Sequence, residues 1–466
     1  MRDNNIKIEP FDIIKLLSFN GEQEINEHGV ITFTGIIPNE KETEYLSMAF
    51  GLTWIDIYIL DPGGGEQLWF KGVITSLEIE SDHEVKVLCV TAKTSSCLMD
   101  VSLHTRSYQD PGTTYDAVLA TYTNDYPSGG FIMKKGSGEA IDDLIFQYRE
   151  TDWEFTKRLA SHFNTVLIPD CQAGGVKYYF GVESGGTAAT ISTGTYKVKK
   201  DMVEYQYKTS RGADITEIDA LYYLLRYRDA YKLGEQIRLN DKPLYICRIS
   251  TCLEGHELYH TYYLKTLAGF QVPKEFNLNT IGASFYGTVL EIEKDQVKIT
   301  LSLDENKDET GTRWFPYSTV YSTPDGTGWY AMPEIGDDIR MYIPDEDEAG
   351  AYVISSVHLE PSASDERVNP DFKSIMNKHK KEVLFTPDSL IFTNNDGMSI
   401  QLLDDEGIKI ISDKTIYIQS DENINIASTH DRIVIMAPDE MLFQQGETNT
   451  HLLENITFTG AQVHLT

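Results

Sequence analysis

The sequence predicts a mainly β protein, in which two β-barrels flank an α+β insert and are followed by a small barrel of the OB type and a C-terminal β-helix. Three observations predict this fold. Apolar and polar residues alternate in the barrel segments, as they do in half-buried strands. Apolar residues spaced as in helices gather between residues 101 and 200. After residue 381, pairs of apolar residues recur about every eight residues, which indicates a solenoid or β-helix.

The chain is long and strongly acidic. Its 466 residues correspond to about three to five domains of ordinary size. The formal net charge is -32, and because an acidic surface repels phosphate backbones, we expect no nucleic acid partner. No segment has the roughly 18 consecutive apolar residues of a membrane span, and the N-terminus lacks a signal-peptide core. We therefore expect synthesis in the cytoplasm without a signal peptide.

Residues 1–100 are predicted to form the first barrel. Residues 61–65 read Asp-Pro-Gly-Gly-Gly and fit a hairpin loop, because glycine adopts the positive φ of such turns readily. The alternating segments expected as strands are 29–35, 53–60, 68–79 and 84–90.

Residues 201–272 are predicted to form the second barrel. A meander of three strands is expected there, and it resembles a strand triplet in the first barrel. We interpret this similarity as a diverged internal duplication. The three strands are expected at 233–239, 243–249 and 259–267, and their counterparts at 51–60, 68–77 and 85–92.

Residues 101–200 are predicted to form the α+β insert. Apolar residues three and four apart predict helices over 115–122 and over 141–163. Within the second range, Thr151 and Asp152 offer an N-cap for a helix that begins near Trp153.

Residues 273–360 are predicted to form the OB-type barrel, because five short strands in so few residues suit a small closed barrel. The acidic run 345–348 lacks the spacing of a calcium loop, so we expect a solvated turn there. Residues 361–381 are polar and are expected to form a linker or neck. The five strands are expected at 286–291, 297–303, 311–315, 339–343 and 351–357.

Residues 382–466 carry the repeat and are predicted to form a needle. Each unit has two large apolar residues separated by one residue and followed by a polar corner. Two inward side chains per strand form only a narrow apolar face, which must pack against other such faces to become buried. One chain would form fewer than three coils with unprotected ends, whereas three intertwined chains use every unit, so we expect an obligate homotrimer. The predicted trimer core is Ile400, Leu402, Ile408, Ile410, Ile416, Ile418, Ile424, Ile426, Ile433, Ile435, Met441 and Phe443.

Three stretches of the sequence carry a family resemblance. The first is Gln147-Tyr148-Arg149-Glu150-Thr151-Asp152-Trp153-Glu154-Phe155, and the others are 70–78 and 328–339, the last completed by 353–358. With the order of the parts, these stretches resemble the VgrG spike of type VI secretion and the fused hub and needle proteins of contractile phage tails, including phage-tail-like bacteriocins. The first stretch matches the family's hub signature.

The resemblance implies a structural protein with no catalytic residues, metal or cofactor. It implies a homotrimeric baseplate hub whose six barrels mate with a hexameric tail tube, and a needle that pierces the target envelope when the sheath contracts. The expected location is an extracellular or virion-like particle. Because residues 463–466 lack the His-x-His pair of iron-bearing needle tips, we expect a separate tip protein.

Two enzymatic alternatives remain open. His256, Glu257 and His260 match the His-Glu-x-x-His pattern of zinc proteases, although the surrounding residues predict strand where that pattern requires a helix. A β-helix that acts on polysaccharides is the second alternative, with acid and base drawn from the repeat's polar corners. Its candidate residues are Asp404, Asp405, Glu406, Asp439 and Glu440.

Overall fold

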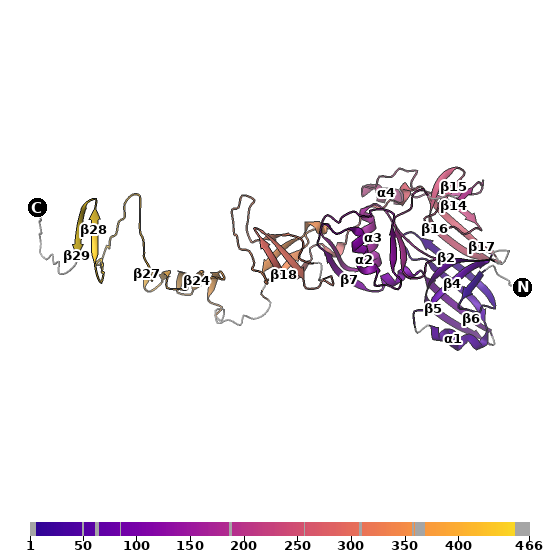
Figure 1. Cartoon of the computed structure of the whole chain (residues 1–466), viewed down its shortest axis with the longest axis horizontal. Helices are drawn as coiled ribbons and strands as arrows, with labels where there is room; N and C mark the ends of the chain where they lie inside the picture. The colour runs from indigo at the N-terminus through magenta and orange to yellow at the C-terminus, as the bar shows by residue number, and fades with distance from the viewer. Residues whose placement is uncertain are drawn as a thin grey trace. The chain divides into compact units, whose positions relative to one another are not determined.

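The chain divides into two compact units, Met1–Leu359 and Glu360–Thr466, whose elements are labelled in Figure 1. No helix among the described residues is long and apolar enough to cross a membrane. The computed structural model describes residues 6–48, 51–60, 65–83, 85–185, 189–255, 257–306, 310–356, 358 and 369–452.

A twelve-stranded sheet dominates the first unit. Ten of its strands follow one another in the order β1-β4-β5-β6-β3-β2-β16-β17-β14-β13. Off this path, β15 pairs with β16, and β12 pairs with β15. The strands are β1 (Ile6–Glu9), β2 (Lys15–Glu24), β3 (Val30–Ile37), β4 (Trp54–Leu60), β5 (Glu66–Asp82), β6 (Val85–Lys93), β12 (Ala189–Ile191), β13 (Lys197–Lys200), β14 (Leu221–Tyr227), β15 (Gln236–Leu239), β16 (Lys242–Glu254) and β17 (Glu257–Lys265).

The two predicted barrel segments share this sheet. Strand β2 of the first segment pairs with β16 of the second, with Gly21 opposite Thr251. Each segment still has its own apolar core, one built around Phe33 and Phe70 and the other around Ile246 and Leu264. The mainly β class is confirmed, and the sheet that joins the two segments is a feature that the sequence did not predict. The short helices η1 (Asn39–Lys41) and α1 (Glu42–Ser47) follow β3.

The insert combines helices with two small sheets, β7-β9 and β10-β11-β8. Helices are confirmed where the sequence predicts them near Tyr115 and after Thr151. The elements are η3 (Ser95–Asp100), β7 (Leu103–Tyr108), α2 (Tyr115–Thr123), β8 (Gly130–Met133), β9 (Ile145–Thr151), α3 (Asp152–His162), β10 (Leu167–Pro169), β11 (Lys177–Phe180) and α4 (Met202–Ser210).

The prediction of a helix from residue 141 onward is wrong, because strand β9 occupies 145–151. Both faces of β9 are buried. Ile145 packs in the insert's core, while Phe146 and Tyr148 pack with the core of the following barrel. A strand buried on both faces lacks the alternation that would have distinguished it from a helix.

A closed five-stranded barrel follows, in the order β18-β19-β20-β22-β21. Strands β20 and β22 are parallel, whereas the other neighbours are antiparallel. Four of the five predicted strands are confirmed, whereas the third, expected at 311–315, overlaps β20 only at Phe315. Their bounds are β18 (Ser284–Glu293), β19 (Gln296–Leu301), β20 (Phe315–Ser318), β21 (Asp338–Tyr342) and β22 (Tyr352–Ser356), with short helices η4 (Ala268–Phe270), η5 (Leu278–Thr280) and η7 (Glu348–Gly350).

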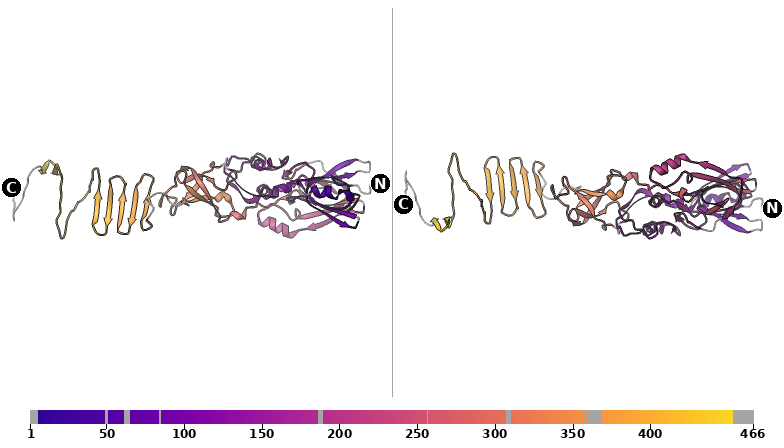
Figure 2. Two further views of the ribbon diagram at one scale, coloured as in Figure 1. Left: turned by 90° about the horizontal axis from the view of Figure 1, so that it is seen from below. Right: turned by 90° about the horizontal axis from the view of Figure 1, so that it is seen from above.

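The second unit begins with an antiparallel meander of five short strands, which Figure 2 shows as a ladder. Its first strand lies within the range predicted as a linker. Residues 412–440 contain no strand, whereas the sequence predicts strands around Ile416, Ile424 and Ile433. The strands are β23 (Lys373–Met376), β24 (Glu382–Thr386), β25 (Ser389–Thr393), β26 (Ser399–Leu403) and β27 (Gly407–Ile411), and a hairpin of β28 (Met441–Gln445) and β29 (Thr448–Leu452) follows.

Candidate functional site

The signature segment bends from strand β9 into helix α3. Thr151 is the N-cap of the helix, and its hydroxyl accepts a hydrogen bond from the backbone N–H of Glu154 at 3.1 Å. The Glu154 carboxylate in turn accepts one from the backbone N–H of Thr151 at 3.0 Å. This reciprocal capping box fixes the point at which the chain turns.

Asp152 is the polar centre of the segment. It is 1% exposed, and its Oδ1 accepts hydrogen bonds from Arg106 Nη1 at 2.5 Å and from Gln147 Nε2 at 2.9 Å. Its Oδ2 accepts one from the Tyr126 hydroxyl at 2.7 Å. A buried carboxylate with one cation and two neutral donors is well satisfied, so this network has a structural rather than a reactive character.

The remaining signature residues make packing contacts. Trp153 is buried and donates from Nε1 to the backbone oxygen of Asn26 at 3.0 Å, which ties α3 to the first barrel segment. Phe155 is fully buried in the insert's core. Arg149 is exposed, and its guanidinium lies 5.4 Å from the centre of the Tyr148 ring.

A buried ion cluster joins the insert to the five-stranded barrel. Arg158 of α3 is 3% exposed and donates to Glu150 Oε1 and to Glu348 Oε1 at 2.8 and 2.7 Å. Burial by itself lowers the pKa of Arg158, but the carboxylates of Glu348 and Glu150 outweigh burial and hold it above its usual value. Burial also raises the pKa of Glu150. The prediction of a solvated acidic turn is therefore wrong for Glu348, which is buried against Arg158.

A second set of polar contacts crosses the same boundary. Asp304 of the barrel is buried and accepts hydrogen bonds from the backbone N–H of Ser107 at 3.0 Å and from its hydroxyl. Burial raises the pKa of Asp304, although these hydrogen bonds oppose the rise. Glu305 accepts from His104 Nδ1 at 2.8 Å and from the backbone N–H of Thr105 at 2.9 Å.

Aromatic packing completes this boundary. The Tyr148 and Phe146 rings each meet the Phe285 ring edge-on, with centroids 4.8 and 4.9 Å apart. Together with the ion cluster, these contacts form what we call the joint, defined by Phe146, Glu150, Arg158, Phe285, Asp304 and Glu348. Moving the insert relative to the five-stranded barrel would break buried salt bridges and aromatic packing, so such a movement is energetically costly.

The apolar pairs of the repeat lie on one face of the meander. Cross-strand partners project to the same face of a sheet. One ladder of directly opposed residues is Val383, Phe392, Ile400 and Ile410, and the other is Phe385, Leu390, Leu402 and Ile408.

This apolar face is not covered within one chain. Ile408 is 73% exposed and Ile410 is 58% exposed. On β26, Ile400 is 46% exposed and Leu402 is 41% exposed. The other predicted core residues are also at least partly exposed, in the strandless segment or on β28. Among these, Ile418 and Ile426 are each 69% exposed. The remaining ones are Ile416, Ile424, Ile433, Ile435, Met441 and Phe443.

The zinc-protease pattern has no suitable geometry in its described part. His256 lies outside the described residues. Glu257 and His260 lie on strand β17 three residues apart, so they project to opposite faces. Glu257 forms an exposed ion pair with Arg228 at 2.7 Å, whereas His260 is fully buried beside Trp69. Burial lowers the pKa of His260 to about 4.

The carboxylates proposed for polysaccharide chemistry lie on exposed turns. Asp404, Asp405 and Glu406 form the turn between β26 and β27, and Asp439 and Glu440 precede β28. Across the described part of the chain, no group of three or more His, Cys, Asp or Glu side chains is arranged to hold a metal ion.

Comparisons with known proteins rest on structure alone. No protein-family model matches the sequence, and no curated protein matches it. A component of the E. coli type VI secretion system, c3393, which is itself structurally similar to the T4 tail proteins gp27 and gp5, matches with a TM-score of 0.53 and 13% identity. The match covers 75% of this chain and 98% of that one.

Structures of the Francisella PdpA-VgrG complex match over more of the chain. The half-lidded form gives a TM-score of 0.55 at 11% identity and covers 87% of both chains. The lidded form gives 0.56 at 12% identity and covers 87% of this chain and 80% of that one. The chain therefore has the VgrG-like hub-and-spike fold.

Proposed function

We propose that the protein is the trimeric hub and spike of a contractile injection system, with a mechanical and not a catalytic role. The observation that carries this proposal is the uncovered apolar face of the meander. Each large aliphatic or aromatic side chain gains about 1.5–3 kcal/mol when it is fully buried, and here a whole ladder of them faces solvent. Two further copies of the same chain would cover it.

The three copies would form an intertwined β-helix. Strands between residues 412 and 440 are absent from one chain because, on this proposal, their hydrogen-bond partners belong to the other two. A single sheet with an exposed apolar face is an aggregation hazard, which trimerisation removes. The core would be the predicted set from Ile400 to Phe443.

The first unit would be the hub. Three copies present six barrel segments, which would match the six-fold symmetry of a tail tube, and the five-stranded barrel, which we assign to the OB type, would lead to the needle. We propose tube and baseplate proteins as partners and a separate tip protein at the needle's end. The particle would be a phage tail, a bacteriocin or a secretion machine.

Electron microscopy of the particles tests this proposal. Antibodies against the first unit should label the end of the tube, and particles should fail to assemble when the protein is absent. The alternative is an enzyme. If the purified chain depolymerised a polysaccharide or cleaved protein, and if Glu257→Gln abolished the cleavage, the mechanical proposal would be overturned.

A further inference from the structure

An exposed hairpin lies between β20 and β21 of the five-stranded barrel. We call residues 319–333 the aromatic hairpin. Its two sides meet at an antiparallel bridge between Ser322 and Gly328. Next to this bridge, the backbone N–H of Trp329 donates a hydrogen bond to the carbonyl oxygen of Tyr321 at 2.7 Å. The register therefore places Tyr321 and Trp329 directly opposite each other.

Hydrogen bonds order the aromatic hairpin at its tip and at its base. At the tip, Asp325 Oδ1 accepts hydrogen bonds from the backbone N–H of Thr327 at 2.9 Å and from the Thr323 hydroxyl. At the base, the Tyr330 hydroxyl donates to the backbone oxygen of Lys294 at 2.8 Å, which ties the hairpin to the loop between β18 and β19. A loop that is ordered before binding loses less conformational entropy when a ligand binds.

The aromatic hairpin exposes two rings on one face. Cross-strand partners project to the same face, with Cβ atoms about 4.5–5.5 Å apart, so Tyr321 and Trp329 form one platform. Tyr321 is 53% exposed and Trp329 is 58% exposed. Of the five tryptophans in the chain, Trp329 alone is exposed. Because tryptophan and tyrosine dominate the energetics of binding surfaces, this platform is a candidate binding site.

The aromatic hairpin is almost uncharged. Asp325 is its one charged residue, whereas 24% of the whole chain is charged. Small hydroxyl side chains accompany the rings, namely Thr319, Ser322, Thr323 and Thr327. In binding loops, tyrosine and tryptophan supply rigid contact area, and small polar residues supply adaptable hydrogen bonds. This composition suits a ligand that is neutral and rich in hydroxyl groups.

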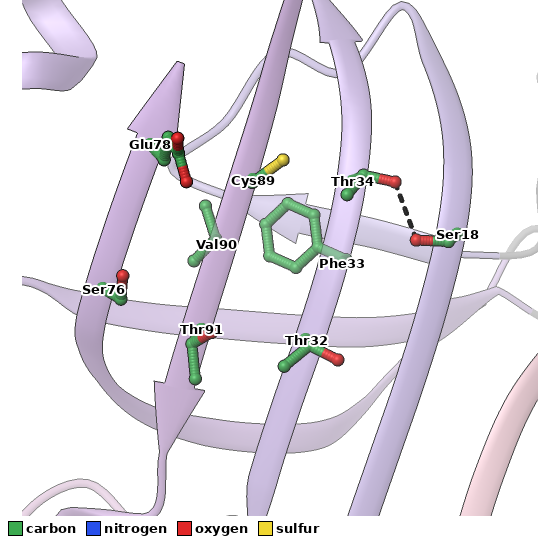
Figure 3. Close-up of a pocket in the computed structure, with 9 residues that line it drawn as sticks. All are labelled: Ser18, Thr32, Phe33, Thr34, Ser76, Glu78, Cys89, Val90 and Thr91. Atoms are coloured by element: carbon green, nitrogen blue, oxygen red, sulfur yellow. Dashed lines mark hydrogen bonds between the residues drawn. The ribbon is translucent and has the colours of Figure 1, made fainter. Parts of the chain in front are cut away.

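A second hydroxyl-lined surface, on the large sheet, displays its hydroxyl groups without an exposed ring. Figure 3 shows a hollow of about 190 Å³ whose lining includes Thr32, Thr34, Ser76 and Thr91. Phe33 also belongs to this lining, but it is only 1% exposed. The hollow therefore offers hydrogen bonds without a surface on which a ligand can stack. The aromatic hairpin combines both features.

We propose that the aromatic hairpin binds a neutral glycan. The C–H face of a sugar ring packs on Tyr321 and Trp329, and the sugar hydroxyls form hydrogen bonds with the hydroxyl side chains beside them. An acidic glycan, a nucleic acid or the acidic surface of a second copy finds no lysine or arginine in the hairpin. Anionic membranes are likewise recognised by clusters of these cations. Charge therefore favours a neutral ligand over all four.

The hairpin binds this glycan without cleaving it. Glycoside hydrolysis ordinarily uses a pair of carboxylates that flank the scissile bond, whereas Asp325 is the only carboxylate residue of the hairpin and closes its tip. In the proposed spike, such a glycan would belong to the target envelope. The binding itself does not depend on the proposed trimer or on its mechanical role.

Calorimetry and tryptophan fluorescence of the purified full chain test this site. Chitohexaose, cellohexaose and maltohexaose are neutral probes, and at least one of them should bind and shift the emission of Trp329. Tyr321→Ala with Trp329→Ala should weaken that binding at least about tenfold. Tyr321→Phe with Trp329→Phe keeps both rings and should retain most of the affinity.

Tyr286→Ala is the matched control. Tyr286 lies on β18 of the same barrel, outside the hairpin, and is 40% exposed, so this variant should bind the glycan as the natural chain does. Oligogalacturonate, an acidic glycan, and vesicles that contain phosphatidylserine should not bind the natural chain.

Several results would overturn the glycan site. One is the absence of binding to all three neutral probes, and another is a folded double alanine variant that binds as tightly as the natural chain. Vesicle binding that the double alanine variant loses would assign the hairpin to a membrane surface. Shielding of Trp329 from acrylamide in the free protein would assign it to a contact between copies. The mass of the protein in solution tests the trimer separately.

Discussion

The two units differ in how their apolar and charged side chains are buried and paired. In the first, apolar residues fill internal cores and buried charges find partners within the same chain, as Arg158 does with Glu150 and Glu348. In the second, the largest apolar side chains lie in regular ladders that face solvent, and Ile408 is 73% exposed. The first unit can therefore be stable alone, whereas the apolar face of the second would be covered by the other copies of the proposed trimer.

The largest expected effect comes from substitutions in the needle, which should disrupt the second unit and leave the first unit intact. Ile416→Asp with Ile418→Asp should abolish the trimer, because each charge would be buried three times without a partner. Thermal unfolding of the first unit should change little. Sedimentation measures the first effect and calorimetry the second.

Tyr417→Asp is the matched control for that experiment. Tyr417 lies between the two isoleucines and is 78% exposed, and the repeat places it on the outer side. This variant should remain trimeric. If it dissociated as fully as the double variant, or if the double variant stayed trimeric, the assignment of inward positions would be wrong.

The second effect concerns the joint. Arg158→Met should lower the free energy of unfolding of the first unit by about 3–5 kcal/mol, because two buried carboxylates lose their cation. Denaturant titration measures this change, and the trimer should persist. Arg149→Met, at an exposed signature position, should have little effect, so equal losses for the two variants would refute a structural role for the ion cluster.

The third effect is a pH dependence. Burial raises the pKa of Glu204, but hydrogen bonds from Lys208 and Lys265 outweigh burial and lower it to about 2 from a usual 4.5. Between those values the unfolded chain binds a proton that the folded chain does not. This contribution, about 3 kcal/mol, is therefore complete above pH 4.5 and is lost as the pH falls toward 2.

Unfolding of Glu204→Gln at several pH values measures that contribution. The variant should be clearly less stable than the natural chain at pH 7, and the difference should shrink below pH 4.5. Glu139→Gln, at an exposed position, should follow the natural chain at every pH. A difference for Glu204→Gln that stayed constant down to pH 2.5 would contradict the assigned pKa.

The smallest effect concerns the turn in the signature segment. Thr151→Ala should cost about 1 kcal/mol, because the helix loses its N-cap hydroxyl. Thr114→Ala removes a longer cap bond of 3.3 Å at helix α2 and should cost less. The two values come from denaturant titration, and a reversed order would argue against the capping box as the stronger constraint.

The sequence predicted what depends on local pattern. The spacing of Ile400, Leu402, Ile408 and Ile410 was sufficient to place these residues on one face, because strand period and register follow from neighbouring residues. Thr151 was recognisable as a cap for the same reason. Four of the five strands of the small barrel also showed their alternation clearly.

The sequence could not predict what depends on distant partners. Glu348 sits in an acidic run that looks solvated, and its partner Arg158 lies 190 residues away along the chain. The insert buries one face of strand β9 and the five-stranded barrel buries the other. The spacing of its apolar residues was therefore also compatible with a helix. The pairing of β2 with β16 joins segments more than 200 residues apart in the chain, so the sequence around either strand does not reveal it.

The mass of the purified full chain in solution tests the central claim most directly. Light scattering or sedimentation equilibrium should give three times the 52.8 kDa of one chain, independent of concentration over a wide range. A soluble, folded protein of 52.8 kDa would contradict the account, because the apolar ladders of the second unit would then be stable in water without a partner.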